Sequence, residues 1–140
     1  MAETFDIEIA TPERLLAREK AIRAQIPAKE GYIGVLPDHA ALLSKLGIGA
    51  LTYTTPEDHR FSIAIAGGFL EINDNVVRVL TDVAEKGHEI DVTRAEKALK
   101  RAQEAMINPA LGMDIASALI AIRHAQARID AARKEASKED

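Results

Sequence analysis

The sequence predicts an α+β fold in which an all-β sandwich, residues 1–86, precedes an antiparallel two-helix hairpin, residues 87–140. Two observations predict this arrangement. From Phe5 to about Val83, short apolar segments alternate with turns rich in glycine, proline and aspartate, which is typical of a sandwich or barrel. From Asp91 onward, the apolar residues repeat every three or four positions, as they do on one face of a helix.

The first part divides into eight candidate strands. Its opening segment, Phe5–Ala10, alternates apolar and polar residues, as a half-buried strand does. We interpret Gly67-Gly68 as a β-turn or bulge between two strands, because a phosphate-binding loop would lead into a helix. The candidate strands cover residues 5–10, 20–26, 32–36, 41–46, 48–54, 60–66, 68–72 and 76–80.

The second part predicts two helices with a break between them. Asp91 is placed to cap the first helix and Asp114 the second, and Asn108-Pro109 and Gly112 interrupt the chain between them. Helices joined by a short loop pair antiparallel. The expected apolar stripe of the first helix is Ala95, Ala98, Leu99, Ala102, Ala105 and Met106, and the second helix has Ile115, Leu119, Ile122 and Ile129 on one side.

The stripe of the first helix consists mostly of alanine. Alanine buries little area, and apolar burial stabilises by about 25 cal/mol per Å². We therefore expect a hairpin that can detach from the sandwich or dock on a partner.

Composition disfavours several classes of protein. The chain has no cysteine, so it has neither disulfides nor a thiolate metal site, and its net charge of −4 argues against a nucleic-acid partner. No apolar run reaches the roughly 18 residues of a membrane span, so no direct membrane insertion is expected. The acidic, alternating start is unlike a signal peptide, and we expect a soluble, cytoplasmic chain.

The four histidines do not predict an active site. His39, His59, His88 and His124 lack the spacing of a metal motif, and no Gly-x-Ser-x-Gly elbow accompanies them. His39 follows Pro37-Asp38, which suits a tight turn. It is either a turn residue whose ring bonds nearby backbone or part of a surface that another protein recognises.

Two groups of charged residues have two readings each. Arg94 and Arg101 lie seven apart on nearly the same helical face, so with Asp91 they form either a cap and a solvated face or a small site for an anion. The basic residues of the second helix form either a solvated face or a strip that meets an acidic partner.

One stretch matches a family signature. Residues 31–40, GYIGVLPDHA, place two glycines before Pro-x-His-Ala. Leu42-Leu43 and the segment from Gly67 to Glu71 follow, and Ile90-Asp91-x-x-Arg94-Ala95 opens the first helix. In this order, before a charged hairpin, these residues resemble the epsilon subunit of bacterial F-type ATP synthase over nearly the whole chain.

The resemblance implies a ten-stranded sandwich that clamps the gamma subunit and rests on the proton-carrying ring. Such a subunit belongs to the rotating central stalk, peripherally bound at the cytoplasmic face of the bacterial cell membrane, and couples rotation to ATP synthesis without catalysing any reaction. The hairpin would extend into the alpha/beta catalytic head and block ATP hydrolysis, which a lightly packed hairpin suits. The residues implied are Glu30, Tyr32 and His39 for gamma and the ring, and Arg123, Arg128, Arg133 and Lys134 for the inhibitory basic strip.

The chain departs from the family in two places near this signature. Tyr32 stands where many relatives carry glutamate, with Glu30 nearby, so the contact with the ring should be less electrostatic. Asp38 stands where glycine is common, and aspartate tolerates a left-handed backbone better than most residues.

Some bacterial members of the family bind ATP when the hairpin is folded down, and the resemblance implies ATP as a regulatory ligand with no catalytic cofactor. One departure concerns this site. The family uses basic residues four apart on the second helix, whereas Arg123 and Arg128 are five apart, about 140° around a helix. The contacts implied are Glu85, Ile90, Asp91, Arg94, Ala95 and Arg101.

Two other classes of protein are weighed against the stalk subunit. A free-standing sandwich with a helical tail that senses a nucleotide would not co-purify with gamma. An enzyme of the cupin or esterase type is disfavoured by the scattered histidines and the absent nucleophile elbow.

Overall fold

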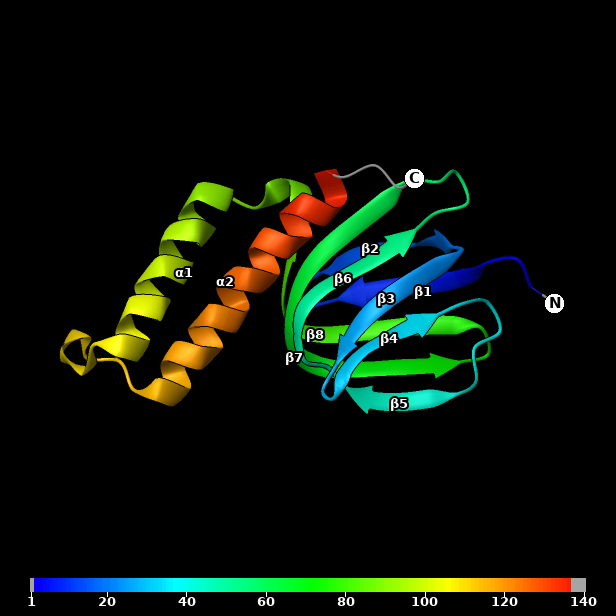
Figure 1. Ribbon diagram of the computed structural model, residues 1–140. Coiled ribbons are helices and arrows are strands. Elements are labelled where there is room, and N and C mark those ends of the chain that lie inside the picture. Colours follow the sequence, from blue (N-terminus) through cyan, green and yellow to red (C-terminus); the bar gives the residue numbers. More distant parts are fainter. Residues whose placement is uncertain (1, 137–140) are drawn as a thin grey trace.

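The computed structural model describes residues 2–136 and shows a β-sandwich with a helical hairpin packed on one side of it (Figure 1). The predicted order of sandwich and hairpin is confirmed, although residues 137–140 of the predicted hairpin lie outside the described residues. The strands are β1 (Phe5–Ala10), β2 (Leu15–Ala21), β3 (Arg23–Ala28), β4 (Gly31–Val35), β5 (Leu42–Lys45), β6 (Ile48–Thr54), β7 (Arg60–Asn73) and β8 (Val76–Lys86). The helices are α1 (Val92–Ile107) and α2 (Ile115–Ala136), with short 3₁₀ turns η1 (Gly87–Glu89) and η2 (Pro109–Leu111).

One continuous sheet forms both layers of the sandwich. The strand order is β2-β1-β8-β7-β6-β3-β4, with β5 also paired to β7, and every pair is antiparallel except β1 with β8. Residues 60–66 of β7 pair with β6, whereas residues 69–72 pair with β5, so β7 passes from one layer to the other (Figure 1). Because β8 accompanies β7 through both layers, these two long strands count twice when strands are counted layer by layer. The eight strands of the described residues therefore give ten when they are counted layer by layer, which is the number that the resemblance implies.

Gly67 and Gly68 lie inside β7 and do not separate two strands, contrary to the sequence prediction. Their φ angles are +74° and +107°, and the ladder with β8 continues on both sides of them. The twist reverses the alternation, because even-numbered residues up to Ala66 and odd-numbered residues from Phe69 point away from the core. A Cβ on Gly68 would lie 2.0 Å from the Leu80 carbonyl oxygen, so only glycine fits there.

The core lies between the two layers and follows the predicted alternation of the strands. Large aliphatic side chains dominate it, and many of them are fully enclosed. A core of this kind holds the sandwich together without the helices. Its largest enclosed members are Phe5, Ile7, Ile9, Ile26, Leu51, Ile65, Leu70, Ile72, Val35, Val77 and Val79.

The predicted strand of residues 20–26 is wrong. The chain breaks at Ile22 between β2, which starts earlier at Leu15, and β3, which pairs with β4 and β6 on the other side of the sandwich. The alternating pattern of residues 20–26 comes from the end of one strand and the start of the next, so periodicity alone did not reveal the break.

Both helices of the hairpin begin where the sequence predicts. Asp91 caps α1 by accepting a hydrogen bond from the Arg94 amide at 3.1 Å, and Asp114 caps α2 by accepting one from the Ser117 amide at 2.7 Å. Helix α1 packs on α2, and α2 packs on the sheet (Figure 1). Alanines fill both sides of α2, the buried ones being Ala118, Ala125, Ala127 and Ala131.

The expected apolar face of α2 is only partly buried. Ile129 is buried, but Ile115 is 63% exposed and Leu119 is 42% exposed. The reason is geometric, because the first turns of α2 project beyond the sheet together with the tip of the hairpin (Figure 1). Small residues meet the sheet and α1, and the larger residues near the tip meet solvent.

Candidate functional site

The contact between α2 and the sandwich is the first candidate site, because it decides whether the hairpin stays docked. Its apolar part consists of Ala127 and Ala131 of α2 packed with Ala50 of β6, Ala64 of β7 and Ile90. Ile90 is the only large side chain among the buried members of this cluster in the described residues, and the partly buried Ile48 packs against it. The alanine stripe of α1, from which a detachable hairpin was predicted, packs on α2, and the contact with the sandwich is made by α2. That the hairpin detaches stays a prediction.

Three side chains of α2, Arg128, Lys134 and Glu135, make polar contacts across this interface. Arg128 Nε donates to Glu85 Oε1 at 2.8 Å, and Arg128 Nη2 donates to Glu85 Oε2 at 3.3 Å. Glu135 Oε1 accepts from the Ser62 amide at 2.9 Å, and Glu135 Oε2 lies 2.7 Å from His88 Nδ1. The Lys134 ammonium lies 5.3 Å from the centre of the Tyr32 ring, a cation–π contact worth about 0.5–1 kcal/mol at an exposed site.

Of the residues predicted to bind ATP, four lie at the start of α1, whereas Arg101 lies farther along that helix and Glu85 near the end of β8. They are not alike in accessibility. Ile90 and Ala95 are buried, and Asp91 is the cap of α1. Arg94 and Arg101 are exposed, and their guanidinium groups make no hydrogen bond or ion pair within residues 2–136. Glu85 is already paired with Arg128, a member of the predicted basic strip.

His124 is a residue that the sequence reasoning missed. It lies four residues before Arg128, at the spacing expected for the basic pair of α2, and lines a small cavity of about 40 Å³ with Glu85 and Arg128. Arg123 is exposed on another side of the helix. The sequence shows this spacing of four, but only arginine and lysine were counted as basic residues of α2.

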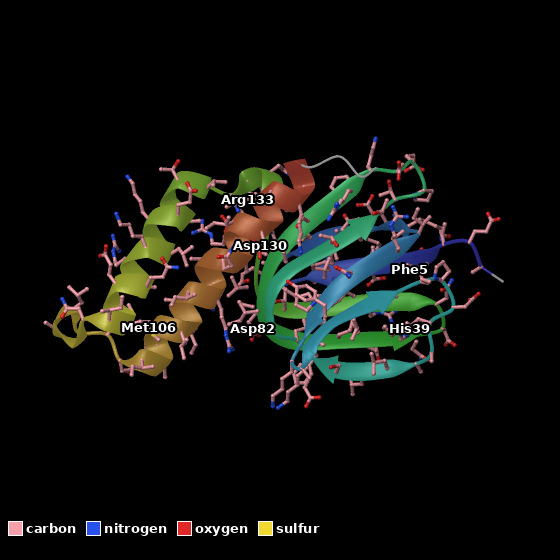
Figure 2. The ribbon with its side chains drawn as sticks, viewed as in Figure 1. Phe5, His39, Asp82, Met106, Asp130 and Arg133 are labelled. Atoms are coloured by element: carbon pink, nitrogen blue, oxygen red, sulfur yellow. The ribbon has the colours of Figure 1, made fainter. Side chains whose placement is uncertain are left out.

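The predicted basic strip of α2 does not form one surface in this state. Arg123 and Arg133 are exposed (Figure 2, for Arg133), whereas Arg128 points at the sheet and pairs with Glu85. Lys134 contacts Tyr32. The docked hairpin therefore occupies two of the four predicted cations.

His39 lies at the end of the sandwich that is farthest from the hairpin (Figure 2). It follows a turn at Pro37-Asp38, and its Nδ1 is 2.8 Å from the Ala40 carbonyl oxygen, to which it donates as the Nδ1–H tautomer. Asp38 has a φ of +63°, so the left-handed backbone expected there is confirmed. The Asp38 amide donates to Asn75 Oδ1 at 2.8 Å, which fixes this turn to the β7–β8 turn.

Glu30 and Tyr32, the other residues predicted for the partner contact, lie at and beside the β3–β4 turn. Glu30 is exposed in the turn itself. The Tyr32 hydroxyl accepts a hydrogen bond from the Ala50 amide at 3.0 Å, and its ring faces Lys134 of α2. The structure thus separates Tyr32, which contacts the hairpin, from His39.

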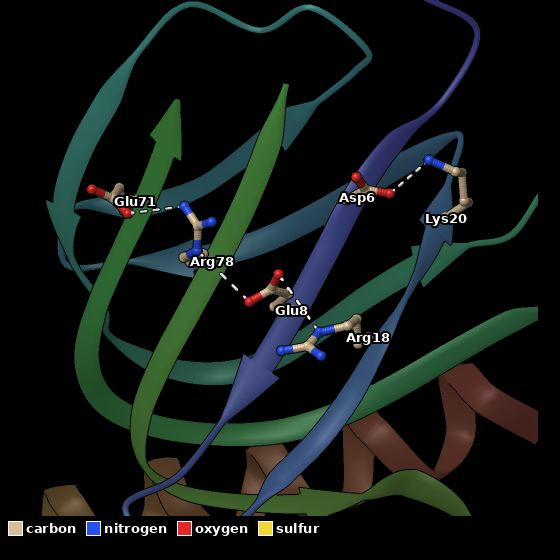
Figure 3. Close-up of polar contacts among 6 residues, drawn as sticks. All are labelled: Asp6, Glu8, Arg18, Lys20, Glu71 and Arg78. Atoms are coloured by element: carbon tan, nitrogen blue, oxygen red, sulfur yellow. Dashed lines mark hydrogen bonds and ion pairs between the residues drawn. The ribbon is translucent and has the colours of Figure 1, made fainter. Parts of the chain in front are cut away.

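The second candidate site lies on the layer formed by β5, β7, β8, β1 and β2. We call the side of this layer that points away from the core the outer face. An ion-pair ladder crosses it, with Arg78 3.5 Å from Glu71 and 3.7 Å from Glu8, and Arg18 3.7 Å from Glu8 (Figure 3). Beside the ladder, an exposed apolar row runs from strand to strand in register. The row is Phe69, Leu80, Ala10 and Leu15, and Leu43 lies next to Glu71.

This outer face is open in the described residues. Leu80 is 57% exposed and Leu43 is 74% exposed, and the hairpin packs on β6 and on β7 in the other layer. Exposed apolar side chains that adjoin one another and are bordered by charges are typical of a protein–protein interface.

Burial strongly perturbs one titratable group of the described residues. The buried Tyr53 hydroxyl donates to Glu19, and burial together with that bond raises the pKa of Tyr53 above its usual range. Residues 2–136 contain no group of three His, Cys, Asp or Glu side chains that could hold a metal ion. Among the same residues, neither helix has the length and apolarity needed to cross a membrane.

Comparison with known proteins gives consistent results over the whole chain. Residues 4–87 match the family model of the ATP synthase delta/epsilon chain beta-sandwich domain, and residues 88–133 match that of its long alpha-helix domain. The ATP synthase epsilon chain of Solibacter usitatus is 52% identical over 96% of this chain and all of that protein. The epsilon chain of Syntrophomonas wolfei is 42% identical over 96% of this chain and 98% of that protein.

Solved structures agree. A chain of the Euglena gracilis mitochondrial ATP synthase, from the OSCP/F1/c-ring assembly in rotational state 1, aligns with a TM-score of 0.77 and 25% identity over 95% of this chain and 83% of that chain. A chain of the Tetrahymena thermophila central stalk and c-ring shares the fold, with a TM-score of 0.52, 14% identity and coverage of 94% and 96%. The chain therefore belongs to the ATP synthase delta/epsilon family as a bacterial epsilon chain, a non-catalytic subunit of the synthase.

Proposed function

We propose that this epsilon chain is a rotor subunit of the central stalk, which holds the gamma subunit to the proton-carrying ring at the cytoplasmic face of the cell membrane. One observation carries the proposal: the sandwich leaves the outer face, with its exposed apolar row beside the ion-pair ladder, uncovered while the hairpin occupies a different face. The uncovered outer face offers a fixed grip for a shaft, and the assembly of the Euglena relative, which contains F1 and a c-ring, supports this role.

The outer face and the adjoining His39 turn are the surfaces we assign to gamma, and the Glu30 turn to the ring. Co-purification tests this assignment and separates it from a free-standing nucleotide sensor, because a stalk subunit comes down with gamma. Within residues 2–136 the His39 side chain bonds only the neighbouring Ala40 carbonyl, so His39→Ala should leave folding intact and weaken gamma binding. An unchanged affinity would remove His39 from the interface.

The hairpin is the regulatory part of this proposal. It would leave the sandwich, extend into the alpha/beta head and block ATP hydrolysis, with Arg123, Arg128, Arg133 and Lys134 as the strip that meets the head. Support comes from the interface itself, where most of the apolar residues are alanines and where Arg128 and Lys134 would become free on undocking. A chain that ends after Asp91 should give faster ATP hydrolysis in the assembled synthase, and an unchanged rate would leave only the coupling role.

ATP as a regulatory ligand remains part of the proposal. Arg94 and Arg101 present two exposed guanidinium groups on α1, and Glu85, Ile90, Asp91 and Ala95 lie at its base. Because Arg128 is held by Glu85, a phosphate would have to compete with that carboxylate. Addition of millimolar ATP to the isolated chain should shift the amide resonances of α1 and α2, and constant shifts would exclude binding.

A further inference from the structure

We propose that the junction of Glu135, Ser62 and His88 sets how firmly the hairpin docks, through two opposing effects at one place. This inference rests on the proposed mobility of the hairpin. Glu135 holds the end of α2 on the sandwich by hydrogen bonds, whereas the buried hydroxyl of Ser62 weakens the docked state.

Glu135 holds α2 on the sandwich because it accepts a hydrogen bond from a strand amide that has no partner in the sheet. The ladder between β7 and β8 ends at Ile63 with Lys86, and the next residue, Gly87, begins the η1 turn. Ser62, one position beyond the ladder, donates its amide to Glu135 Oε1 at 2.9 Å. The Glu135 side chain is only 13% exposed, so this charged bond is partly shielded from water.

His88 adds the second bond. Its Nδ1 lies 2.7 Å from the other carboxylate oxygen of Glu135, so both oxygens of Glu135 have partners on the sandwich side of the interface. Lys86 lies close by, lining the same cavity as His88 and Glu135. One side chain of α2 thereby joins β7 and η1.

The Ser62 hydroxyl opposes docking. Ser62 is completely buried, and its Oγ has no hydrogen-bond partner among the described residues. A buried hydroxyl without a partner loses the hydrogen bonds that it makes to water when exposed, which destabilises the state that buries it. When the hairpin leaves, water reaches both the amide and the hydroxyl of Ser62.

The backbone of α2 closes this junction tightly. A Cβ built on Gly87 would lie 2.6 Å from the Ala131 carbonyl oxygen and 3.1 Å from the Ser62 carbonyl oxygen. The helix, the turn and the strand are therefore in direct contact around Ser62. The Glu135 hydrogen bonds stabilise the docked state and the Ser62 hydroxyl destabilises it. Because they come from different side chains, single substitutions can separate the two effects.

Amide hydrogen exchange of the full chain tests the inference, with α2 as the readout and the strands as the internal reference. Ser62→Ala should slow the opening of α2 about tenfold, and Glu135→Ala should speed it about tenfold. Glu135→Gln should stay close to the wild type, because the amide oxygen still accepts from Ser62 and its NH₂ group can donate to His88. Gln126→Ala, a change on the exposed side of the same helix, is the matched control and should have no effect.

The outcomes distinguish this inference from the function on which it rests. If α2 opens independently of the strands but Ser62→Ala does not slow it, or Glu135→Ala does not speed it, the inference is overturned and the mobile hairpin stands. If the amides of α2 exchange only together with those of β1 and β7, the hairpin does not detach on its own, and the proposed mobility is overturned along with the inference.

Discussion

A single methyl group on Gly87 should undock the hairpin while the sandwich stays folded. Gly87 is the first residue of η1 and is buried beneath α2. The added Cβ of Gly87→Ala would lie 2.6 Å from the Ala131 carbonyl oxygen, and Cβ atoms do not approach other atoms closer than 3.0 Å. The oxygen belongs to the helix backbone and not to a flexible side chain, so α2 and the η1 turn must separate to admit the methyl group.

The size of the effect follows from that movement. Overpacking a close contact costs about 1–3 kcal/mol. Because the contact exists only in the docked state, the ratio of docked to undocked hairpin should fall by about 5- to 150-fold. The strands should keep their stability, since Gly87 follows the last residue of β8 and contributes nothing to the core of the sandwich.

Two measurements check this prediction. Hydrogen exchange of the isolated chain should show faster exchange in α2 with unchanged protection in β1 and β7. In the assembled synthase, ATP hydrolysis should slow, because a freed hairpin reaches the catalytic head more often. Gly34→Ala is the control, since a Cβ on Gly34 meets no atom within 4 Å. If the amides of α2 are as well protected from exchange in Gly87→Ala as in the wild type, this account of the interface is refuted.

Three further predictions follow from other contacts. Gly68→Ala, which forces a Cβ to 2.0 Å from the Leu80 carbonyl oxygen at a φ of +107°, should lower the free energy of unfolding by about 3 kcal/mol or more in urea denaturation, whereas Gly34→Ala should not. Leu80→Asp, on the exposed row of the outer face, should weaken gamma binding about tenfold by calorimetry without changing the melting temperature, and equal affinity would exclude that face. Hydrogen bonds from the Ser117 amide and the Ser117 side chain lower the pKa of Asp114. The stabilisation of α2 by Asp114 should therefore be present at neutral pH and be lost as the pH falls through that lowered pKa. Asp114→Ala should remove this acid-dependent loss of helical circular dichroism.

The sequence was sufficient to predict features that depend on local chemistry. The change of period near residue 90 marked the border between strands and helices. Asp91 and Asp114 marked the starts of the two helices and Asn108-Pro109 the end of α1, because caps and proline act within a few positions. The turn before His39 was predictable for the same reason.

Features that depend on tertiary position were not predictable. Gly67-Gly68 is a turn signal in any local reading, yet here it twists a strand that β8 pairs on both sides. Ile115 and Leu119 fit an apolar helical face, but the part of the sheet they would meet ends before them, so smaller alanines face the sheet instead. The pairing of Glu85 with Arg128 joins residues 43 positions apart, which no spacing rule reveals.

The two kinds of packing in this chain explain how one subunit can both hold and move. Large aliphatic side chains fill the sandwich, and burying each of them fully contributes about 1.5–3 kcal/mol, so the grip on a partner does not depend on the hairpin. Between α2 and the sheet, alanines leave most of the specificity to Glu85–Arg128 and to Glu135 with Ser62 and His88. Polar contacts of this kind contribute little net free energy because water replaces them readily. Their exchange with water, or with charges on a partner, is therefore the step at which the position of the hairpin can be controlled.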